Sequence, residues 1–318
     1  MKKFIRISLI VIVVLLTAAA LFSCAHLVVI DKQIERETLD ISTYIPELTS
    51  TTSLEILPLF ENDSADIDLA TGHGVSYLVR TDQTTVILDL GMNPPDTVLP
   101  YFLRNFTELK QDWEEVDAVV LSHNHPDHVG GIVPWKNDTF TLGDFRLPLE
   151  KITFYTPIPM SYPNASLIYA LQPVQVGTDI ATTGSIPFRE VFPLWLTTPK
   201  NYEQALVVRV EDQGLVLVTG CGHPGLQTLV ERAETLYREP VVGVVGGLHY
   251  DKASAADLQP EIDFLAARQP GLVALSPHDS MPDATQALAD AFPQAYKEIK
   301  VGQPIQFPYI ASISEKFE

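Results

Sequence analysis

The protein has 318 residues, which is enough chain for a large hydrophobic core in one or two domains. Hydrophobic residues make up 46% of the chain and charged residues 19%, and this composition argues against a disordered protein or a coiled coil. The net charge of −19 argues against a nucleic-acid partner, because an acidic surface repels the phosphate backbone. The two cysteines, Cys24 and Cys221, are too few for a disulfide framework or a cysteine-based zinc ribbon.

Residues 1–30 predict an export signal that also anchors the protein to a membrane. Lys2, Lys3 and Arg6 precede an apolar run that continues to Ile30. Leu21-Phe22-Ser23-Cys24 resembles a bacterial lipobox, in which Phe22 replaces the usual small residue, and cleavage there places lipid on Cys24. Alternatively, the run is long enough to span a bilayer as an uncleaved helix. Both alternatives place the body of the protein on the extracytoplasmic side.

A polar tether at 31–50 is predicted to precede one folded domain at 51–318. Short apolar runs bounded by turn residues predict its strands, and apolar side chains on one helical face predict its helices. In chain order, the predicted elements are strands 54–60, 74–80 and 84–90, helix 94–109, strands 116–121, 152–155, 205–210 and 215–219, helix 226–237, strand 241–245, helix 251–268, strand 272–275, helix 283–292 and strand 305–307.

Strand pairs and helices alternate in both halves of this domain. The helix at 94–109 is expected to place Val98, Phe102 and Phe106 on one face. Residues 132–200 are rich in proline, threonine and glycine, and they predict an elaborated insert. The alternation favours a layered α/β domain in which helices cover the sheets.

Three histidines and an aspartate lie within six residues, directly after the predicted buried strand at 116–121. Alternation along an extended turn places the imidazoles of His123 and His125 on one side, and Asp127 and His128 follow at once. Imidazole and carboxylate groups are donors that transition metals prefer. The sequence therefore predicts a metal site at the end of this strand.

The segment Ser122–Gly131 reads His-X-His-X-Asp-His and then Gly-Gly, and it resembles the first metal motif of the metallo-β-lactamase-fold hydrolases. Gly72-His73-Gly74 and Ile87-Leu88-Asp89-Leu90-Gly91 also resemble that family. The resemblance covers roughly residues 53–307. It implies an αββα sandwich with the site at one edge, between the two sheets.

Four further segments resemble a branch of the family that is related to an archaeal ribofuranosylaminobenzene-phosphate synthase and is often labelled dihydropteroate-synthase-like. They are Glu203–Leu206, Thr219–Gly225, Val245–His249 and Ser276–His278. The chain departs from the family twice. Cys221 stands where the common superfamily has an aspartate, which leaves the bridging ligand open. Asp279-Ser280-Met281 stands where the branch usually has Cys-Thr-Gly, which leaves the substrate open.

The chemistry of such a site requires two divalent metal ions, expected to be zinc, which hold a hydroxide and polarise a substrate oxygen. The expected ligands of one ion are His123, His125 and His223. Those of the other are Asp127, His128 and His278. Asp127 is also the expected catalytic residue, because its carboxylate is placed to orient the attacking hydroxide.

Four other residues are candidates for contacts with the substrate or with the ligands, namely His73, Asp89, Cys221 and His249. Asp89 is favoured as a carboxylate that holds the motif loop. For Cys221 three interpretations remain open. A buried inert thiol is favoured, and the alternatives are a thiolate metal ligand in place of the aspartate and a redox or nucleophilic group.

The sequence thus predicts an exported, membrane-anchored binuclear metal-dependent hydrolase that acts on an ester, phosphoester or amide-type bond of a small molecule. A pterin-related transferase or synthase of the same fold is one alternative, and export argues against it because its precursors are cytoplasmic. A non-enzymatic metal-binding protein is another, and the intact first motif argues against it. The fold alone does not fix the substrate.

Overall fold

The computed structural model describes residues 2–39, 47–94, 97–143, 149, 151–190, 194, 198 and 200–308. The chain divides into two compact units. One unit is formed by residues 1–41 and 187–201, and the other by residues 42–186 and 202–318.

The first unit contains helix α1 (Lys2–Leu39) and parts of the paired strands β8 (Ile186–Arg189) and β9 (Lys200–Glu203). Two ion pairs lie within it. The Arg189 guanidinium is 3.1 Å from the Asp31 carboxylate, and Lys200 Nζ is 2.7 Å from Glu37.

The N-terminal predictions fall on α1 and on the residues that follow it. Helix α1 continues through residues 31–39, the first part of the predicted tether, whereas residues 40–46 lie outside the described part of the chain. The side chain of Cys24 also lies outside it. Among the residues that the structure describes, no helix has both the length and the apolar character that a membrane span requires. The anchor and the tether therefore stay predictions.

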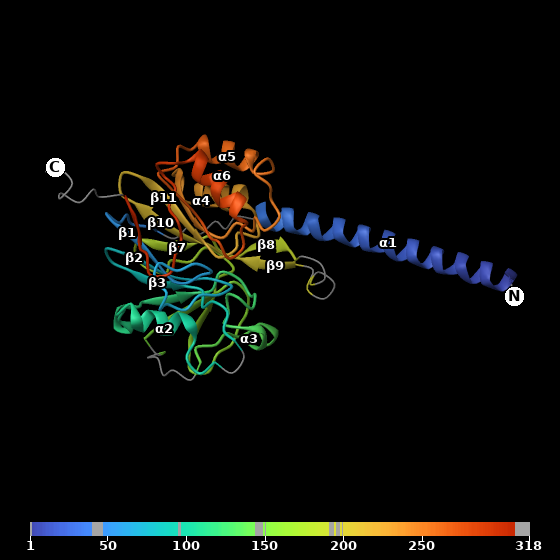
Figure 1. Cartoon of the computed structure of the whole chain (residues 1–318), viewed down its shortest axis with the longest axis horizontal. Helices are drawn as coiled ribbons and strands as arrows, with labels where there is room; N and C mark the ends of the chain where they lie inside the picture. Colours follow the sequence, from blue (N-terminus) through green and yellow to red (C-terminus); the bar gives the residue numbers. More distant parts are fainter. Residues whose placement is uncertain are drawn as a thin grey trace. The chain divides into compact units, whose positions relative to one another are not determined.

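The second unit is built on two β-sheets (Figure 1). The larger sheet has seven strands, in the spatial order β14 (Ile305–Phe307), β1 (Leu54–Phe60), β2 (Ser76–Thr81), β3 (Thr85–Leu88), β4 (Ala118–Val120), β5 (Thr153–Thr156) and β6 (Ser166–Tyr169). The smaller sheet has five strands, in the order β13 (Leu272–Leu275), β12 (Val241–Gly246), β11 (Gly214–Thr219), β10 (Leu206–Val210) and β7 (Ile180–Thr182). Strands β3 and β4 run parallel, as do β11, β12 and β13.

A hydrophobic core fills the space between the two sheets. Ile56, Val79 and Val86 of the larger sheet belong to the same buried cluster as Val208 and Val216 of the smaller sheet. Side chains alternate across a strand, so each strand of this cluster gives every second residue to the inner face. The two sheets therefore pack face to face.

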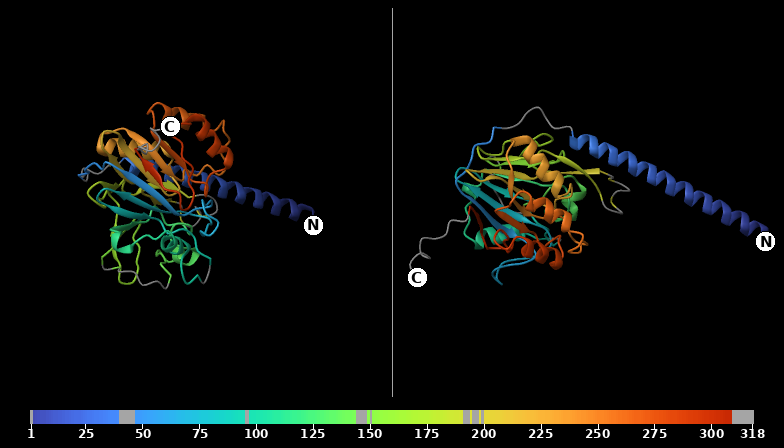
Figure 2. Two further views of the ribbon diagram at one scale, coloured as in Figure 1. Left: turned by 60° about the vertical axis from the view of Figure 1, so that its left-hand side comes forward. Right: turned by 90° about the horizontal axis from the view of Figure 1, so that it is seen from above.

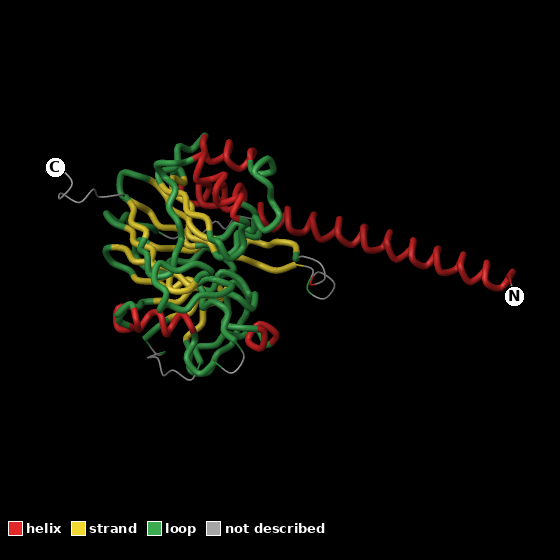
Figure 3. Tube along the Cα trace, in the orientation of Figure 1, coloured by secondary structure: helices red, strands yellow, loops and turns green. Residues whose placement is uncertain are grey.

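Helices cover the outer faces of both sheets (Figures 1 and 2). Helix α2 (Tyr101–Glu108) lies against the larger sheet, and Phe102 and Phe106 are buried there. The outer cluster of the smaller sheet includes residues of α4 (Leu226–Tyr237), α5 (Gln259–Ala266) and α6 (Pro282–Ala291). The order helix–sheet–sheet–helix is visible when helices and strands are coloured separately (Figure 3). The mixed α/β class predicted from the sequence is confirmed.

Three sequence predictions of local structure need correction. Helix α2 begins at Tyr101 rather than at residue 94, and Val98 is 67% exposed instead of lying on the buried face. Helix α5 begins at Gln259 rather than at residue 251, because Pro260 is favoured only in the first turn of a helix. Within the stretch predicted as an insert, β5 and β6 join the larger sheet and β7 joins the smaller one. That stretch also contains the short helix α3 (Ile132–Lys136).

Candidate metal centre

The predicted site residues lie just beyond the carboxyl ends of parallel strands. His123 follows β4, and Asp89 follows the neighbouring strand β3. Cys221 and His223 follow β11, and His278 follows β13 in the same sheet. Parallel strands deliver the residues after their carboxyl ends to one edge of the sheet. The six predicted ligands gather there in two sets of donors.

The first set consists of His123, His125 and His223. His123 Nε2 lies 3.1 Å from His125 Nδ1, and His223 Nε2 lies 3.2 Å from each of those two atoms. Three nitrogens bound to one zinc ion at about 2.0–2.1 Å are separated by about 3.3–3.4 Å in a tetrahedral site. The spacing of these three donors therefore fits one metal ion.

The second set consists of Asp127, His128 and His278, together with Cys221. His128 Nε2 lies 3.4 Å from Asp127 Oδ2 and 3.0 Å from Cys221 Sγ. His278 Nε2 lies 3.2 Å from the same sulfur. The structure thus groups the predicted ligands as the sequence analysis paired them, and it adds the thiol to the second set.

Asp89 orients the imidazole of His128 directly and that of His123 through Ser122. Its Oδ2 atom is 2.7 Å from His128 Nδ1 and accepts a hydrogen bond of 2.6 Å from Ser122 Oγ. Because the Ser122 hydroxyl donates to Asp89, its oxygen is left to accept from His123 Nδ1, which is 2.9 Å away. The Nδ1 atoms of both histidines are therefore engaged, and their Nε2 atoms face the donor sets.

A second chain of hydrogen bonds holds His278, and no sequence motif marks it. Glu61, the first residue after β1, is fully buried and accepts hydrogen bonds from the hydroxyls of Ser276 and Tyr77. The Ser276 oxygen lies 2.5 Å from His278 Nδ1. Glu61 thus fixes the orientation of His278 through Ser276.

Glu203 supports the loop that carries Cys221 and His223. One of its carboxylate oxygens accepts hydrogen bonds from the backbone N–H groups of Cys221 and Gly222, at 3.1 and 2.8 Å. The other accepts from the N–H of His223 at 2.7 Å. In the sequence, Glu203 stands out only as part of a segment that resembles the archaeal branch, whereas in the structure its carboxylate contacts this loop directly.

Burial and neighbouring charges set the protonation of the donors. Burial and the adjacent histidines hold the pKa values of His123 and His223 well below their usual range, which favours the neutral imidazole that a metal needs. Burial alone raises the pKa of Asp127, but His128, His278 and His73 outweigh it and lower that pKa. Asp127 is therefore an anionic donor.

The second set is electrostatically suited to a cation. Burial alone lowers the pKa of His128, but the charges of Cys221 and Asp127 outweigh it and raise that pKa. The same balance raises the pKa of His278, with Asp279 as the largest favourable charge. Burial also raises the pKa of the Cys221 thiol, against the opposing effects of the two histidines. A metal cation in this set would replace the protons of the two imidazoles beside the Asp127 carboxylate and would favour the ionised form of the Cys221 thiol.

The two remaining candidate histidines lie at the exposed side of the centre. The side chain of His73 is 60% exposed, and its Nε2 atom is 3.4 Å from Asp127 Oδ2. His249 is also exposed, and its ring centre is 4.6 Å from that of His223. Its backbone φ of 57° is uncommon for a residue other than glycine, and Asp279 accepts its N–H at 2.9 Å. Both histidines are accessible to a ligand that enters from solvent.

Asp89→Asn is expected to weaken metal binding by about 10–100-fold, because an amide cannot accept as strongly from both His128 and Ser122. Metal affinity of the variant, measured by competition with a chromophoric chelator, checks this expectation. Asp138→Asn is the matched control, since Asp138 contacts Asn124 rather than any donor. Unchanged affinity in the Asp89 variant would contradict the holding role.

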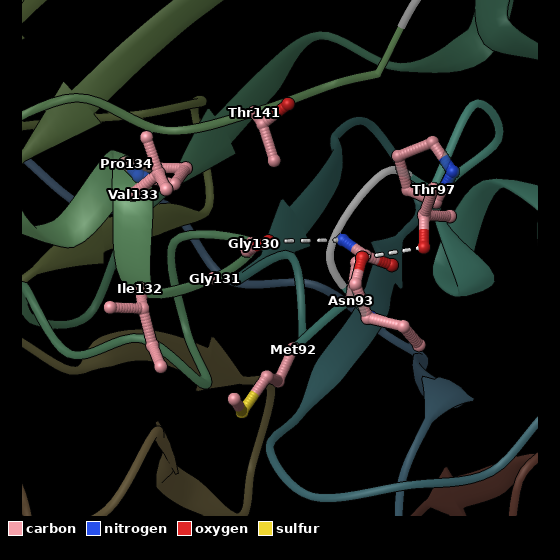
Figure 4. A pocket seen from close by; sticks show the side chains of 11 residues that line it. Met92, Asn93, Thr97, Gly130, Gly131, Ile132, Val133, Pro134 and Thr141 are labelled. Atoms are coloured by element: carbon pink, nitrogen blue, oxygen red, sulfur yellow. Dashed lines mark hydrogen bonds between the residues drawn. The ribbon is translucent and has the colours of Figure 1, made fainter.

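An apolar pocket of about 350 Å³ lies beside the motif loop (Figure 4). Its wall includes Gly130 and Gly131, which follow the histidine motif, together with Met92, Ile132 and Pro134. None of the described metal donors lines it. The pocket is therefore a feature distinct from the donor sets.

Comparison with known proteins agrees with this architecture. Residues 69–219 match the metallo-beta-lactamase superfamily. A 7,8-dihydropterin-6-methyl-4-(beta-D-ribofuranosyl)-aminobenzene-5'-phosphate synthase of Methanocaldococcus jannaschii is 24% identical over 208 residues, which cover 56% of this chain and 70% of that protein. An uncharacterised protein of the same organism is 24% identical over 217 residues, covering 62% of this chain and 80% of that protein.

The crystal structure of Tm1679, a metal-dependent hydrolase of the beta-lactamase superfamily, shares the fold. The two structures align with a TM-score of 0.55 and 21% sequence identity, over 79% of this chain and 98% of that one. The matched segment contains Asp89 and the whole motif from His123 to His128. Residues 69–219 are thus similar to the metallo-beta-lactamase superfamily, and the chain shares the fold of one of its solved members.

Proposed function

We propose that the protein is a binuclear metal-dependent hydrolase. The observation that carries this proposal is the pair of adjacent donor sets, one of three histidines and one with Asp127, His128 and His278. The spacing of 3.1–3.2 Å within the first set fits a single ion. Asp89, Ser122 and Ser276 contact the Nδ1 atoms of the histidine ligands and so fix the orientation of the imidazoles, as metal ligands require.

Zinc ions, when bound, supply a hydroxide nucleophile near neutral pH and polarise the oxygen of the bond that is cleaved. Side chains of the protein orient the nucleophile and bind the substrate. Asp127 is anionic and accepts a hydrogen bond from the nucleophile, which orients it. His249 and His73 are exposed beside the donors and bind the polar part of the substrate. The expected substrate is a small molecule with an ester, phosphoester or amide-type bond.

A second candidate function is a pterin-related transferase or synthase. The similarity to the archaeal synthase, at 24% identity, is the observation that favours it. The two candidate functions differ in the substrates that the reaction consumes. A hydrolase consumes water and one substrate, whereas the synthase class joins two substrates.

The deciding experiment combines metal analysis of the purified chain with a screen of phosphodiester, lactone and β-lactam substrates. We expect about two metal ions per chain and hydrolysis that is lost with a chelator and restored by zinc. Incubation of the loaded protein with a ribofuranosylaminobenzene 5'-phosphate and with a dihydropterin that carries a leaving group on its 6-methyl carbon tests the synthase candidate. Two bound ions with no hydrolysis of any substrate, but with joining of the two precursors, would replace the first candidate by the second.

We further propose that the protein is exported and anchored to a membrane through residues 1–30. The basic start and the apolar run of the sequence support this proposal. We expect the protein to fractionate with membranes. Cys24→Ser should block signal cleavage if Cys24 carries lipid, and gel mobility checks this. Unchanged mobility with retained membrane fractionation would favour the uncleaved helix, and recovery in the soluble fraction would contradict both forms of anchor.

A further inference from the structure

The apolar pocket beside the motif loop has the properties of a ligand site (Figure 4). Its volume of about 350 Å³ lies in the range of pockets that hold small molecules. Ile132 and Val133 of α3 line it and remain 50% and 73% exposed, as is typical of apolar surfaces that bind a ligand. None of the described residues that line the pocket is charged. Because a charged group would lose its hydration there, the pocket favours an apolar occupant.

Hydrogen bonds of the buried side chain of Asn93 give the pocket a defined shape. Its Oδ1 atom accepts the N–H of Tyr101 at 2.8 Å, at the start of α2. Its Nδ2 atom donates to the carbonyl of Gly130 at 3.4 Å, as Figure 4 shows. The N–H of Gly130 in turn donates to the carbonyl of Gly91 at 3.0 Å. The pocket is thus formed before a ligand enters, which lowers the cost of binding.

The wall formed by α3 is connected to the metal motif at both ends of the helix. Helix α3 begins directly after Gly131, which follows the ligand His128 by three residues. Asn124, which lies between two ligands in the motif, donates to the carbonyl of Trp135 at 3.4 Å, in the last turn of α3. Two residues of chain span at most about 7 Å, so Gly130 lies within about that distance of the backbone of His128. The pocket is therefore continuous with the loop that carries the metal ligands.

We propose that this pocket binds an alkyl or aryl group of the substrate, so that the protein acts on an amphiphile whose polar, hydrolysable end lies at the metal centre. The inference rests on the proposed hydrolase function and specifies its substrate class. Each methylene group that moves from water into an apolar pocket strengthens binding about fourfold. A longer alkyl group therefore makes a better substrate until the pocket is filled.

A series of substrates tests this dependence on alkyl length. The series uses the bond that the substrate screen identifies, and its alkyl group lengthens from methyl to octyl. We expect kcat/KM to rise about fourfold with each methylene and then to level off. Ile132→Asp should flatten the rise, because it places a charge in the apolar wall, whereas Ile132→Leu should retain it. Ile67→Asp is the matched control, since Ile67 is 98% exposed and does not line the pocket. Equal kcat/KM for short and long alkyl groups would overturn the proposal and leave the hydrolase function intact.

Photolabelling provides a measurement that does not depend on hydrolysis. Azioctanol, an octanol with a photoreactive diazirine, is added to the full-length protein after a chelator has removed metal ions, and mass spectrometry locates the label. We expect label on Met92 and on residues 132–134, reduced at least about fourfold by Ile132→Asp and unchanged by Ile67→Asp. Label confined to other parts of the chain would overturn the proposal. Label in the pocket without metal-dependent hydrolysis of any substrate would support the pocket and count against the hydrolase.

Discussion

His125→Ala is expected to lower metal-dependent hydrolysis by at least about 100-fold, an effect larger than that of losing an outer hydrogen-bond partner. The His125 Nδ1 atom is 3.1–3.2 Å from the two other donors of its set, and its removal leaves two nitrogens for an ion that needs at least three protein ligands. The ratio kcat/KM, measured with a substrate from the screen, and the bound metal per chain check this result.

The histidine at position 26 supplies the matched control. His26 lies in α1, outside the donor sets, so His26→Ala should leave activity and stoichiometry unchanged. His223→Ala and His278→Ala should each lower the occupancy of one ion, because they belong to different sets. A single bound ion that survives both changes would contradict the binuclear assignment.

Glu203→Ala is expected to lower the free energy of unfolding by about 3 kcal/mol or more. Three backbone N–H groups, those of Cys221, Gly222 and His223, donate to this carboxylate. Each buried donor left without an acceptor costs about 1–3 kcal/mol. Chemical denaturation of the metal-free protein measures the loss. Glu203→Gln keeps one acceptor oxygen and should lose less, and equal stability of the alanine variant and the unaltered chain would contradict the supporting role.

The same carboxyl group predicts a pH dependence of stability. Burial raises the pKa of Glu203 to about 7, although the N–H groups that it accepts from act in the opposite direction. Between about pH 4.5 and pH 7 the folded protein therefore binds this proton more tightly than the unfolded chain does. The proton-linked part of its contribution to stability, as distinct from the three hydrogen bonds, is fully present below that window and is lost as the pH rises through it. Glu203→Gln should remove this part of the pH dependence from the metal-free protein.

Much of the fold follows from local sequence patterns. The strands at 54–60 and 272–275 and the helix at 226–237 were predicted with the bounds that the structure shows, because each is an apolar or amphipathic run between clear turn residues. The histidine ligands could be expected to lie close together because each follows a buried strand. Parallel strands place the residues after their carboxyl ends at one edge of a sheet. Helix α5 is shorter than the sequence pattern predicts, because Pro260 is favoured only in the first turn of a helix and the helix begins there.

The supporting carboxylates could not be chosen from the sequence. The chain has 40 acidic residues, and nothing local marks Glu61 or Glu203 as buried. Glu61 meets Ser276 from 215 positions away, and Glu203 meets the N–H of His223 only through the turn after β11. Such contacts depend on how the two sheets pack against each other. The residue pattern within one strand does not predict that packing.

Strand β1 pairs with β14, with Leu54 opposite Phe307, so the first and the last of the described strands lie side by side at one edge of the larger sheet. Contacts between positions so distant in sequence form late, because a long loop must close before they stabilise the chain. A chain emerging from the ribosome presents His123 to His128 long before His278 and β14 exist. The second donor set cannot be complete before His278 has been synthesised, so during synthesis a metal ion first meets an incomplete set of ligands.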